Sequence, residues 1–348
     1  MRIAIIPGDG IGKEVTAEAV KVLRRVESVF GRQFDLEMLP WSADHYLATG
    51  VTIPPNGYAM LRDDFDAIFI GALGDPRVPD NRHARDILLG TRFELDLYVN
   101  YRPVRLLDAR LCPLKNRTPA DVDFVVFREN TEGVYVGVGG RFKPGTTDEI
   151  ALQEEINTYK GVHRIIKHAF EFARANGHRT VCMADKSNAM TDGHALWQRV
   201  FREMAALYPE IESRHLYIDA LALLMVQDPS QFEVIVTNNL FGDIITDLGA
   251  ALQGGLGLAA SGNLHPGRTS MFEPVHGSAP PLAGKNVANP MGAILSTGLM
   301  LQSLGLVQEG AAVEAAVKHA VVTNNGTKEI GGSLGTTETG DFISQAIR

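Results

Sequence analysis

The sequence predicts an α/β fold built on a largely parallel sheet, and two observations lead to this prediction. Short apolar segments alternate with helical patterns along the chain, and strands are expected at residues 2–6, 67–71, 124–127, 180–184 and 234–237. This alternation is typical of parallel strands joined by helices. The chain has 348 residues, which is more than one hydrophobic core usually holds, so we expect two domains.

A glycine-rich turn, Gly8 to Gly12, follows the first strand and precedes a helix expected over residues 13–29. The Rossmann dinucleotide fingerprint needs glycines at its first, third and sixth positions, and the sixth position here is Lys13. A phosphate-binding loop would need Ser or Thr after that lysine, where this chain has Glu14. We therefore interpret the segment as a tight turn rather than as part of a Rossmann fold.

The remaining segments fit the same α/β pattern. Helical patterns precede the strands at 180–184 and 234–237, and a helix rich in alanine and valine is expected at 311–322. A glycine-rich segment at 331–335 follows that helix. Residues 137–147 are rich in Gly, Thr and Pro, so they predict a loop or an excursion from the main body.

The composition is that of an ordinary globular protein. Its formal net charge of −8 argues against non-specific binding to nucleic acid, which needs a positive surface. The chain has only two cysteines, Cys112 and Cys182, which fits a reducing compartment. No apolar run reaches the roughly 18 residues that a membrane helix needs. We expect a cytoplasmic protein without nucleic-acid or membrane partners.

The most informative segment runs from Asn239 to Leu248 and carries two aspartates. If the segment is helical, Asp243 and Asp247 lie on one face, one turn apart, where like charges repel. A hard divalent cation such as Mg²⁺ or Mn²⁺ would offset this repulsion. The alternative is a solvated acidic face, which the surrounding apolar residues disfavour. Asp219 stands within another apolar run and is the third candidate ligand, because a buried carboxylate needs a metal or an arginine as its partner.

Three arginines are candidates for binding carboxylates. Arg92 and Arg102 flank the segment 96–100, and Arg128 ends an expected strand, where α/β proteins place their sites. Guanidinium groups suit bidentate binding of carboxylates. Taken one at a time, each arginine could also be an ordinary surface charge.

Lys186 also follows an expected strand. A lysine desolvated at such a place can serve as a general base. The alternative is a loop lysine paired with its neighbour Asp185.

The segment from Met271 to Pro280 contains two prolines and a glycine within ten residues, and Asn289 and Pro290 follow shortly after. Such a sequence cannot form a regular element, and a rigid loop with exposed backbone N–H groups can cradle phosphates or adenine. A plain surface turn is the alternative.

Taken together, these motifs resemble the isocitrate/isopropylmalate dehydrogenase family of decarboxylating dehydrogenases. The resemblance covers the whole chain and rests on four motifs in the family's order. These are the arginine pair, the Arg-Glu-Asn-Thr-Glu-Gly run at 128–133, the Asn-Leu-Phe-Gly-Asp segment at 239–243 and the Glu-Pro-Val-His-Gly-Ser-Ala-Pro loop at 273–280.

The resemblance implies a two-domain fold of the isopropylmalate dehydrogenase type, with a largely parallel core sheet. Residues 1–100 and 253–348 would form the dinucleotide-binding domain. Residues 101–252 would form the domain for substrate, metal and dimerisation, with an arm near 137–160. The family's active site lies in the cleft between domains and includes residues of the partner subunit of a homodimer.

The resemblance also implies a role for each motif residue. Arg92, Arg102 and Arg128 would bind the malate carboxylates, and Asp219, Asp243 and Asp247 would bind Mg²⁺ or Mn²⁺ that also chelates the substrate. Lys186 would take the hydroxyl proton and Tyr135 would protonate the enol carbon, with Lys186 and Asp219 serving the opposite subunit. The dinucleotide would contact Glu273, His276, Gly277, Ser278, Ala279 and Asn289, with Ile11 and Asn188 nearby.

The residues before Arg92 indicate the substrate. Isocitrate enzymes place Ser and Asn where this chain has Asp86 and Leu88, so isocitrate is not expected. The apolar pair Leu88 and Leu89 suits the isopropyl group of 3-isopropylmalate, which would be converted to 4-methyl-2-oxopentanoate in leucine biosynthesis. D-malate and tartrate dehydrogenases of the family look similar at these two positions, so these substrates remain alternatives. An arginine at position 85, Arg85, resembles one branch of the isopropylmalate enzymes, which favours 3-isopropylmalate.

The cofactor preference is less clearly marked. NAD enzymes of the family usually carry an aspartate after Ser-Ala-Pro, and NADP enzymes a lysine and a tyrosine, whereas this chain has Pro281 and Leu282. Because no cation is present there to pair with a 2′-phosphate, we expect NAD. A non-catalytic regulatory subunit is the remaining alternative, although such subunits tend to lose the acid–base and metal residues that this chain retains.

Overall fold

The computed structural model describes residues 1–348, and the chain divides into two compact units. The first unit comprises Met1–Leu97, Arg102–Val122 and Ala250–Arg348, and the second comprises Tyr98–Tyr101 and Asp123–Gly249. The chain passes from the second unit into the first within strand β4 (Val99–Arg105).

The unit boundaries differ from the expected domains chiefly in residues 102–122, which the sequence assigns to the second domain, and also at the edges, in residues 98–100 and 250–252. Residues 102–122 form hydrogen bonds with other residues of the first unit and pack against its core. The backbone N–H of Arg105 donates to Gln253 at 2.8 Å, and the guanidinium of Arg110 donates to the carbonyl oxygens of Val321 and Ile330. Leu107 is part of the first unit's larger core. These contacts lie far apart in the sequence, so no local pattern predicts them.

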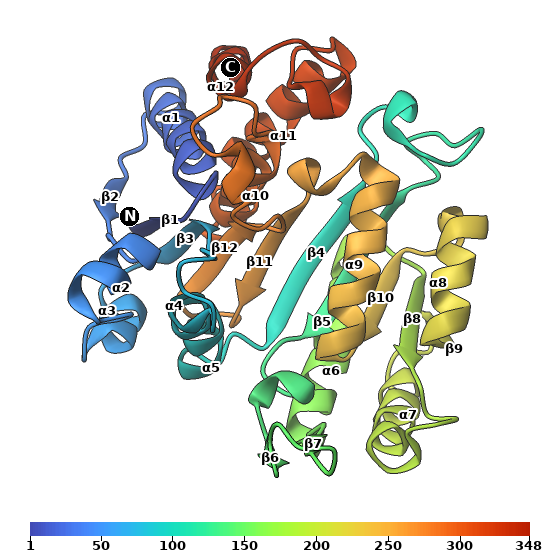
Figure 1. Cartoon of the computed structure of the whole chain (residues 1–348). Helices are drawn as coiled ribbons and strands as arrows, with labels where there is room; N and C mark the ends of the chain where they lie inside the picture. Colours follow the sequence, from blue (N-terminus) through green and yellow to red (C-terminus); the bar gives the residue numbers. More distant parts are fainter. The chain divides into compact units, whose positions relative to one another are not determined.

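The sheet of the first unit is mostly parallel (Figure 1). Its strands are β1 (Arg2–Gly8), β2 (Asp35–Met38), β3 (Ala67–Ala72), β11 (Ala260–Leu264) and β12 (Ser270–Pro274), in the order β2-β1-β3-β12-β11. All pairs are parallel except β11 with β12.

Two cores cover the two faces of this sheet. Ile3 and Ile5 of β1 point into one core, whereas Ala4 and Ile6 point into the other, as the alternation of side chains along a strand requires. The first core packs against α1 (Gly12–Phe30), α10 (Met291–Ser303), α11 (Val307–Val322) and α12 (Thr336–Ala346). The short elements between β2 and β4 are α2 (Ala43–Thr49), α3 (Gly57–Asp63), α4 (Arg82–Ala84), the π-helix η1 (Arg85–Gly90) and α5 (Thr91–Glu94).

The second unit contains four parallel strands in the order β5-β10-β8-β9. They are β5 (Asp123–Glu129), β8 (Thr180–Asp185), β9 (Glu212–Tyr217) and β10 (Val234–Thr237). The helices are α6 (Tyr159–Asn176), α7 (Thr191–Ala205), α8 (Ile218–Gln227) and α9 (Asn239–Gln253), whose last residues belong to the first unit. Short 3₁₀ turns lie at Ala109–Leu111, Val134–Val136, Pro229–Gln231, Leu256–Leu258, Pro280–Leu282 and Lys328–Ile330.

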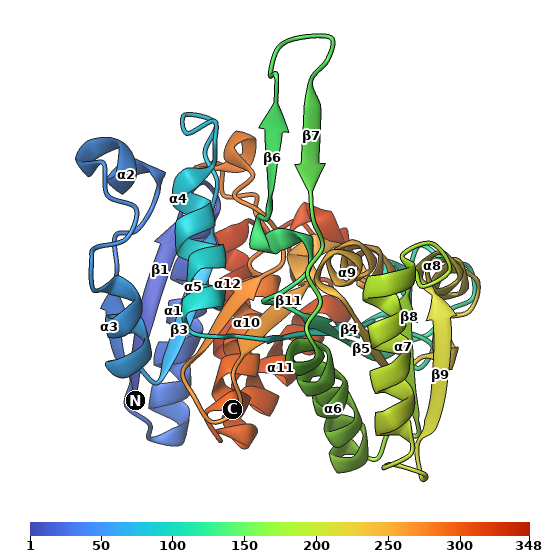
Figure 2. The ribbon, with the colours of Figure 1, turned by 90° about the horizontal axis from the view of Figure 1, so that it is seen from below.

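A two-stranded antiparallel hairpin, β6 (Gly139–Phe142) and β7 (Ile150–Gln153), projects from the second unit (Figure 2). It lies where the sequence predicted an arm, and all eight strand residues are exposed. Among these exposed side chains are the large apolar Phe142, Ile150 and Leu152.

All five expected strands are present, and β10 has the predicted bounds. The helix expected at 13–29 is α1, and the helix expected at 311–322 begins earlier, at Val307. No helix in the structure combines the length and the apolar character that crossing a membrane would require.

Candidate functional site

The glycine turn supports a neighbouring loop. Gly8 and Gly10 have φ angles of 72° and 53°, in the left-handed region that favours glycine. A Cβ atom at Gly10 would lie 2.1 Å from the carbonyl oxygen of Ser278, and the N–H of Ile11 donates to that same oxygen at 2.8 Å. The glycines therefore allow two backbones to approach closely. This agrees with the interpretation of the segment as a tight turn.

The loop after β12 contains buried polar atoms that have no protein partner. Nε2 of His276 and Nδ2 of Asn289 are both buried without a hydrogen bond. Burial lowers the pKa of His276, so its ring is neutral at pH 7. Ala279 adopts the left-handed conformation, with φ 38°, which non-glycine residues rarely adopt and which is strained for a residue with a Cβ atom. Because buried polar groups normally find partners, these atoms fit a ligand rich in hydrogen-bonding groups, such as a dinucleotide.

Glu273 holds one of the predicted arginines. Its Oε1 accepts hydrogen bonds from Nη2 of Arg92 at 2.8 Å and from Nδ2 of Asn263 at 2.9 Å, and all three residues are buried. Nε of Arg92 has no protein partner. The sequence assigned Glu273 to the dinucleotide alone, whereas the structure gives it the further role of orienting Arg92. A charge-assisted bond of this kind fixes a guanidinium well.

The other predicted substrate residues of the first unit lie on two elements. Arg102 is buried on β4, with 6% of its surface exposed. Leu88 and Leu89 lie on η1 and are half-buried. Leu88 packs against the core that contains Ile6 and Trp41, so only part of its side chain is available to a ligand.

Sequence reasoning missed a buried pair beside the glycine turn. The carboxylate of Asp9 accepts hydrogen bonds from the N–H groups of Ala43 and Gly74 at 2.7 and 2.9 Å. Its Oδ2 also lies 2.8 Å from Nε2 of His83, and both side chains are buried. Asp9 thus connects the turn to the start of α2, to the residues after β3 and to α4. The available signal was an aspartate between two turn glycines, which is hard to explain as a surface charge.

In the second unit, Arg128 is 1% exposed and lies against α9. Its Nε and Nη2 donate to Oδ1 of Asn239, and its Nη1 donates to Oδ1 of Asp243 at 2.6 Å. A Cβ atom on Gly242 would lie 2.5 Å from the arginine's side-chain carbons, so the glycine makes room for Arg128. The buried position contradicts the alternative of a surface charge. Asn239 is a further residue that the sequence alone did not single out.

Tyr135 lies next to the same groups. Its hydroxyl donates to Oδ2 of Asp243 at 3.1 Å, and the guanidinium of Arg128 stands 5.3 Å from its ring centroid. The structure therefore brings together the predicted proton donor, one predicted metal ligand and one arginine that is predicted to bind a substrate carboxylate.

Lys186 pairs with Asp219 rather than with Asp185. Its Nζ lies 2.5 Å from Oδ1 of Asp219, and this contact lowers the pKa of that carboxyl. The Asp185 carboxylate is buried and instead binds His215 and Gln198. The inference that Asp219 is buried was wrong for the single chain, because its side chain is 67% exposed at the start of α8.

Asp243 and Asp247 lie one turn apart on α9, as the sequence predicted. Carboxylate oxygens are the donors that Mg²⁺ and Mn²⁺ prefer. No group of three His, Cys, Asp or Glu side chains in the chain is placed to hold a metal, so Asp219 does not join this pair within one subunit. Asn188, predicted near the dinucleotide, is exposed in the turn between β8 and α7.

Comparisons with known proteins identify the family. Residues 2–345 match the model of a protein family that is described as "Isocitrate/isopropylmalate dehydrogenase". The chain belongs to this family. Curated relatives named 3-isopropylmalate dehydrogenase, from Thermobifida fusca and Mycobacterium tuberculosis, are each 45% identical and match 100% of this chain and 98% and 100% of their own lengths.

Solved structures agree in fold. An isocitrate dehydrogenase from Methylococcus capsulatus superposes with a TM-score of 0.89 and 33% identity, covering 100% of this chain and 99% of that one. The TT0538 protein from Thermus thermophilus gives a TM-score of 0.87 at 33% identity, covering 99% of this chain and 68% of that one. The prediction of an α/β fold of this family rather than a Rossmann fold is confirmed.

A second feature of this family member went unnoticed in its sequence. Glu129, beside Arg128 in the family's motif, is buried, and its carboxylate accepts hydrogen bonds from the hydroxyl and N–H of Thr131 and from the N–H of Glu132. Burial raises the pKa of Glu129 to about 7 despite these donors. Through these hydrogen bonds, Glu129 fixes the turn at Thr131 and Glu132, which leads to the segment that carries Tyr135.

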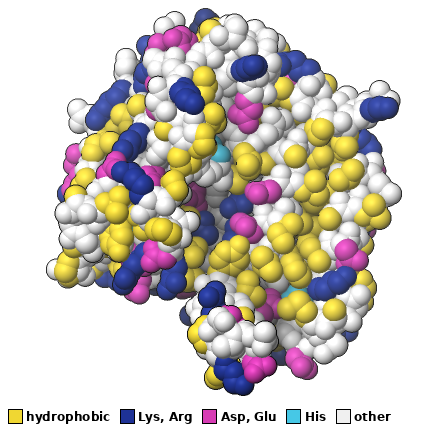
Figure 3. Space-filling model, in the orientation of Figure 1, with side chains coloured by type: hydrophobic (Ala, Val, Ile, Leu, Met, Phe, Trp, Pro, Cys, Tyr) yellow, Lys and Arg dark blue, Asp and Glu magenta, His cyan; other side chains and the backbone are white.

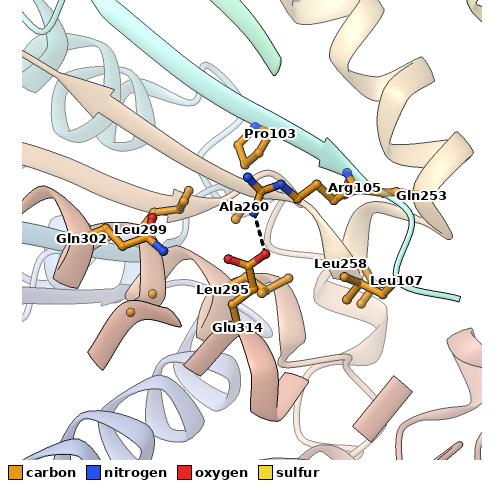
Figure 4. A pocket seen from close by; sticks show the side chains of 12 residues that line it. Pro103, Arg105, Leu107, Gln253, Leu258, Ala260, Leu295, Leu299, Gln302 and Glu314 are labelled. Atoms are coloured by element: carbon orange, nitrogen blue, oxygen red, sulfur yellow. Dashed lines mark hydrogen bonds and ion pairs between the residues drawn. The ribbon is translucent and has the colours of Figure 1, made fainter. Parts of the chain in front are cut away.

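The first unit also has a small hollow of about 40 Å³, apart from all these residues. It is lined mostly by aliphatic side chains, and Arg105 forms an ion pair with Glu314 there at 2.6 Å (Figure 4). Because one water occupies about 10–15 Å³ by this measure, the hollow has room for only a few waters. It is too small for a dinucleotide.

Proposed function

We propose that this protein is an NAD-dependent and divalent-metal-dependent enzyme that oxidatively decarboxylates 3-isopropylmalate to 4-methyl-2-oxopentanoate, in leucine biosynthesis. The observation that carries the proposal is the placement of two half-buried leucines, Leu88 and Leu89, just before the buried Arg92. An apolar surface next to a carboxylate-binding arginine fits a malate with an aliphatic substituent. The 3-isopropylmalate dehydrogenases that match this chain over its whole length support the same substrate.

Isocitrate fits less well. The side chain of Asp86 stands where isocitrate enzymes have a serine, and its carboxylate accepts a hydrogen bond from the hydroxyl of Thr52 at 2.7 Å. A fixed negative charge in this segment would repel the third carboxylate of isocitrate. An aliphatic substituent suffers no such repulsion.

We assign binding of the malate carboxylates to the buried arginines Arg92, Arg102 and Arg128. Burial in a low-dielectric environment strengthens each pairing with a carboxylate. Glu273 orients Arg92, and Asn239 orients Arg128. With their guanidinium groups already oriented, the arginines would lose little conformational freedom when substrate binds.

The residues that would hold the cofactors fit their chemistry. Asp243, Asp247 and Asp219 of the opposite subunit offer only oxygen donors. Although Glu273 lies in strand β12 and not in a loop as the sequence predicted, the segment from Glu273 to Ala279 together with Asn289 offers the unpaired polar atoms described above. When bound, the metal ion would polarise the C2 oxygen of the substrate, and the dinucleotide would accept the hydride from C2.

Two side chains would move protons. Lys186 would take the proton from the C2 hydroxyl as the hydride leaves. After the C3–carboxyl bond breaks and carbon dioxide departs, the Tyr135 hydroxyl would donate a proton to C3. Both assignments follow the family's positions, and Tyr135 is already hydrogen-bonded within the group of residues that surrounds Asp243.

We further propose a homodimer whose active sites are shared. Apolar side chains gather over the part of the second unit that carries α8 and α9 (Figure 3), including the exposed Leu223, Val226 and Ile244. Exposed apolar patches of this kind mark interaction surfaces. A second subunit would supply Lys186 and Asp219, which explains why a single chain does not gather the three aspartates.

The test is the initial rate of NAD reduction with Mn²⁺, comparing 3-isopropylmalate with D-malate, D-tartrate and isocitrate. A kcat/KM for 3-isopropylmalate at least about tenfold above the others is the expected result, since an apolar pocket discriminates small alkyl differences by about 1–3 kcal/mol. A preference for D-malate or tartrate would refute the substrate while leaving the chemistry intact. No turnover of any of the four would favour a regulatory subunit.

A further inference from the structure

The segment that carries Leu88 and Leu89 is not a regular α-helix. Residues Arg85–Gly90 form the π-helix η1, which lies between the α-helical turns α4 and α5. π-Helical turns are rare and often accompany function. One physical cause of a break in helix geometry is a side chain that inserts into the i→i−4 hydrogen-bond ladder.

The hydroxyl of Tyr58, from α3, is such an insertion. It donates a hydrogen bond to the carbonyl oxygen of Asp86 at 2.8 Å. In an α-helix, that carbonyl would accept from the N–H of Gly90. A Cβ atom on Gly90 would lie only 2.1 Å from the Tyr58 hydroxyl oxygen, so the hydroxyl occupies space that any other residue at position 90 would fill.

The Tyr58 hydroxyl also remains protonated, so it can always donate this hydrogen bond. Burial, together with the charges of Asp86 and Glu94, raises the pKa of Tyr58 to about 12, so the group keeps its proton at any physiological pH. Its ring packs against the same core as Leu88. Tyr58 therefore contacts the helical segment through its hydroxyl, while its ring packs against the core that Leu88 also contacts.

The π-helical turn changes how the leucines face relative to the arginine. In an α-helix, Leu88 and Arg92 would share a face one turn apart. A wider turn between them rotates the leucines away from that alignment, while Glu273 keeps Arg92 in place. The direction of Leu88 and Leu89 relative to the arginine thus depends on whether the wider turn persists.

We propose that Tyr58 is a positioning residue whose hydroxyl maintains the π-helical turn and thereby sets the selectivity for the substituent at C3 of the malate. The substrate part of this inference rests on the proposed function. The Tyr58 side chain need not touch the substrate, because it acts through the backbone of Asp86.

The test compares Tyr58→Phe and the double variant Tyr58→Phe/Gly90→Ala with the wild type. The double variant removes the inserted hydroxyl and adds a helix-favouring alanine, whose Cβ atom would still lie 2.9 Å from Cζ of the ring at position 58, so the ring must shift slightly. Thr52→Val is the matched control, because it removes a hydrogen bond to the Asp86 side chain but leaves the backbone ladder untouched. Crystal structures report the helix type of residues 85–90. Steady-state rates report the ratio of kcat/KM for 3-isopropylmalate to that for D-malate, with the KM values for malate and for NAD.

In the double variant we expect an α-helical segment and a selectivity ratio changed by about tenfold, the scale of discrimination by small alkyl contacts. The KM for the malates should change while the KM for NAD stays constant, which general destabilisation would not produce. Thr52→Val should keep the π-helix and the wild-type ratio.

A π-helix that persists in the double variant would overturn the proposal, and so would an α-helical segment with an unchanged ratio. The ratio is defined whichever malate the wild type prefers, so a wrong substrate assignment does not hide the result. A wild type that oxidised neither malate would refute the proposed function, and with it the role of Tyr58 in selectivity.

Discussion

The two units balance the polar groups of the candidate site in different ways. In the first unit, Nε of Arg92, Nε2 of His276 and Nδ2 of Asn289 are buried without protein partners. In the second unit, the protein pairs the opposite charges, because Arg128 binds Asp243 and Lys186 binds Asp219. The first unit therefore keeps some polar atoms unpaired, although it also pairs Arg92 with Glu273, whereas the charged groups named in the second unit are paired with each other.

The difference indicates two modes of binding. An unsatisfied buried polar group costs about 1–3 kcal/mol, so a ligand that satisfies the first unit's atoms recovers that free energy through hydrogen-bond fit. A ligand of the second unit must instead replace one ion pair with another, so its binding depends on charge. Mutations that change charge should therefore act most strongly in the second unit.

The largest expected effect is that of Lys186→Met. If Lys186 accepts the hydroxyl proton, kcat should fall by about 10²–10⁴-fold, the range for general acid–base catalysis. The KM for malate should change little. Steady-state rates with 3-isopropylmalate measure both constants, and Lys167→Met, an exposed lysine on α6, is the control that should retain wild-type rates. A fall confined to KM would contradict a proton-transfer role.

Next in size is Asp243→Asn, which keeps an oxygen for Arg128 but removes a metal-binding charge. We expect kcat/KM to fall by more than about a hundredfold, because losing a group that merely orients a ligand already costs 10–100-fold. Part of the activity should return at high Mn²⁺. A Mn²⁺ titration of the initial rate measures this, with Asp192→Asn on α7 as the control. An unchanged Mn²⁺ requirement would exclude Asp243 as a ligand.

A smaller effect concerns the stability of the second unit. The ring of His168 on α6 packs edge-on against the ring of Phe127 on β5, with 5.0 Å between the ring centroids. Burial lowers the pKa of His168 to about 4. Between pH 6.5 and 4 the unfolded chain binds the proton that the folded chain rejects, so stability falls as the pH falls. The free energy of unfolding should lose about 2 kcal/mol from this residue between pH 7 and pH 5.

Urea unfolding at the two pH values tests this expectation. His168→Gln should flatten the pH dependence by that amount, whereas Lys167→Gln, at the exposed neighbouring position, should leave it as in the wild type. An equally steep dependence in His168→Gln would show that other groups carry it.

The smallest expected effect lies in the first unit, where binding depends on hydrogen-bond fit. Pro281→Asp should lower the KM for NAD several-fold, since a carboxylate there could accept a bond from the ribose 2′-hydroxyl, and one hydrogen bond to a charged group is worth about 1.5–3 kcal/mol at most. The KM for NADP should rise or stay constant. Pro281→Ala separates the loss of the ring from the gain of the carboxylate, and an unchanged NAD KM in Pro281→Asp would sink the idea.

The sequence alone was sufficient for the α/β class, the five strands and the motif residues. Strands such as β10 are runs of buried residues whose apolar character is local, and each motif residue carries its chemistry in its own side chain. The relative position of Asp243 and Asp247 was likewise predictable, because residues four apart in a helix lie on the same face, one turn from each other.

Only the tertiary structure decided which polar groups pair. Glu273 lies 181 residues from Arg92, His83 lies 74 from Asp9, and Lys186 lies 33 from Asp219. It also decided that Asp219 is exposed and that Tyr58 interrupts a helical ladder 28 residues away. Local propensity acts over a few neighbouring residues, whereas these contacts arise from the packing of distant elements. The sequence therefore named the candidate groups, and the fold determined what holds each of them in place.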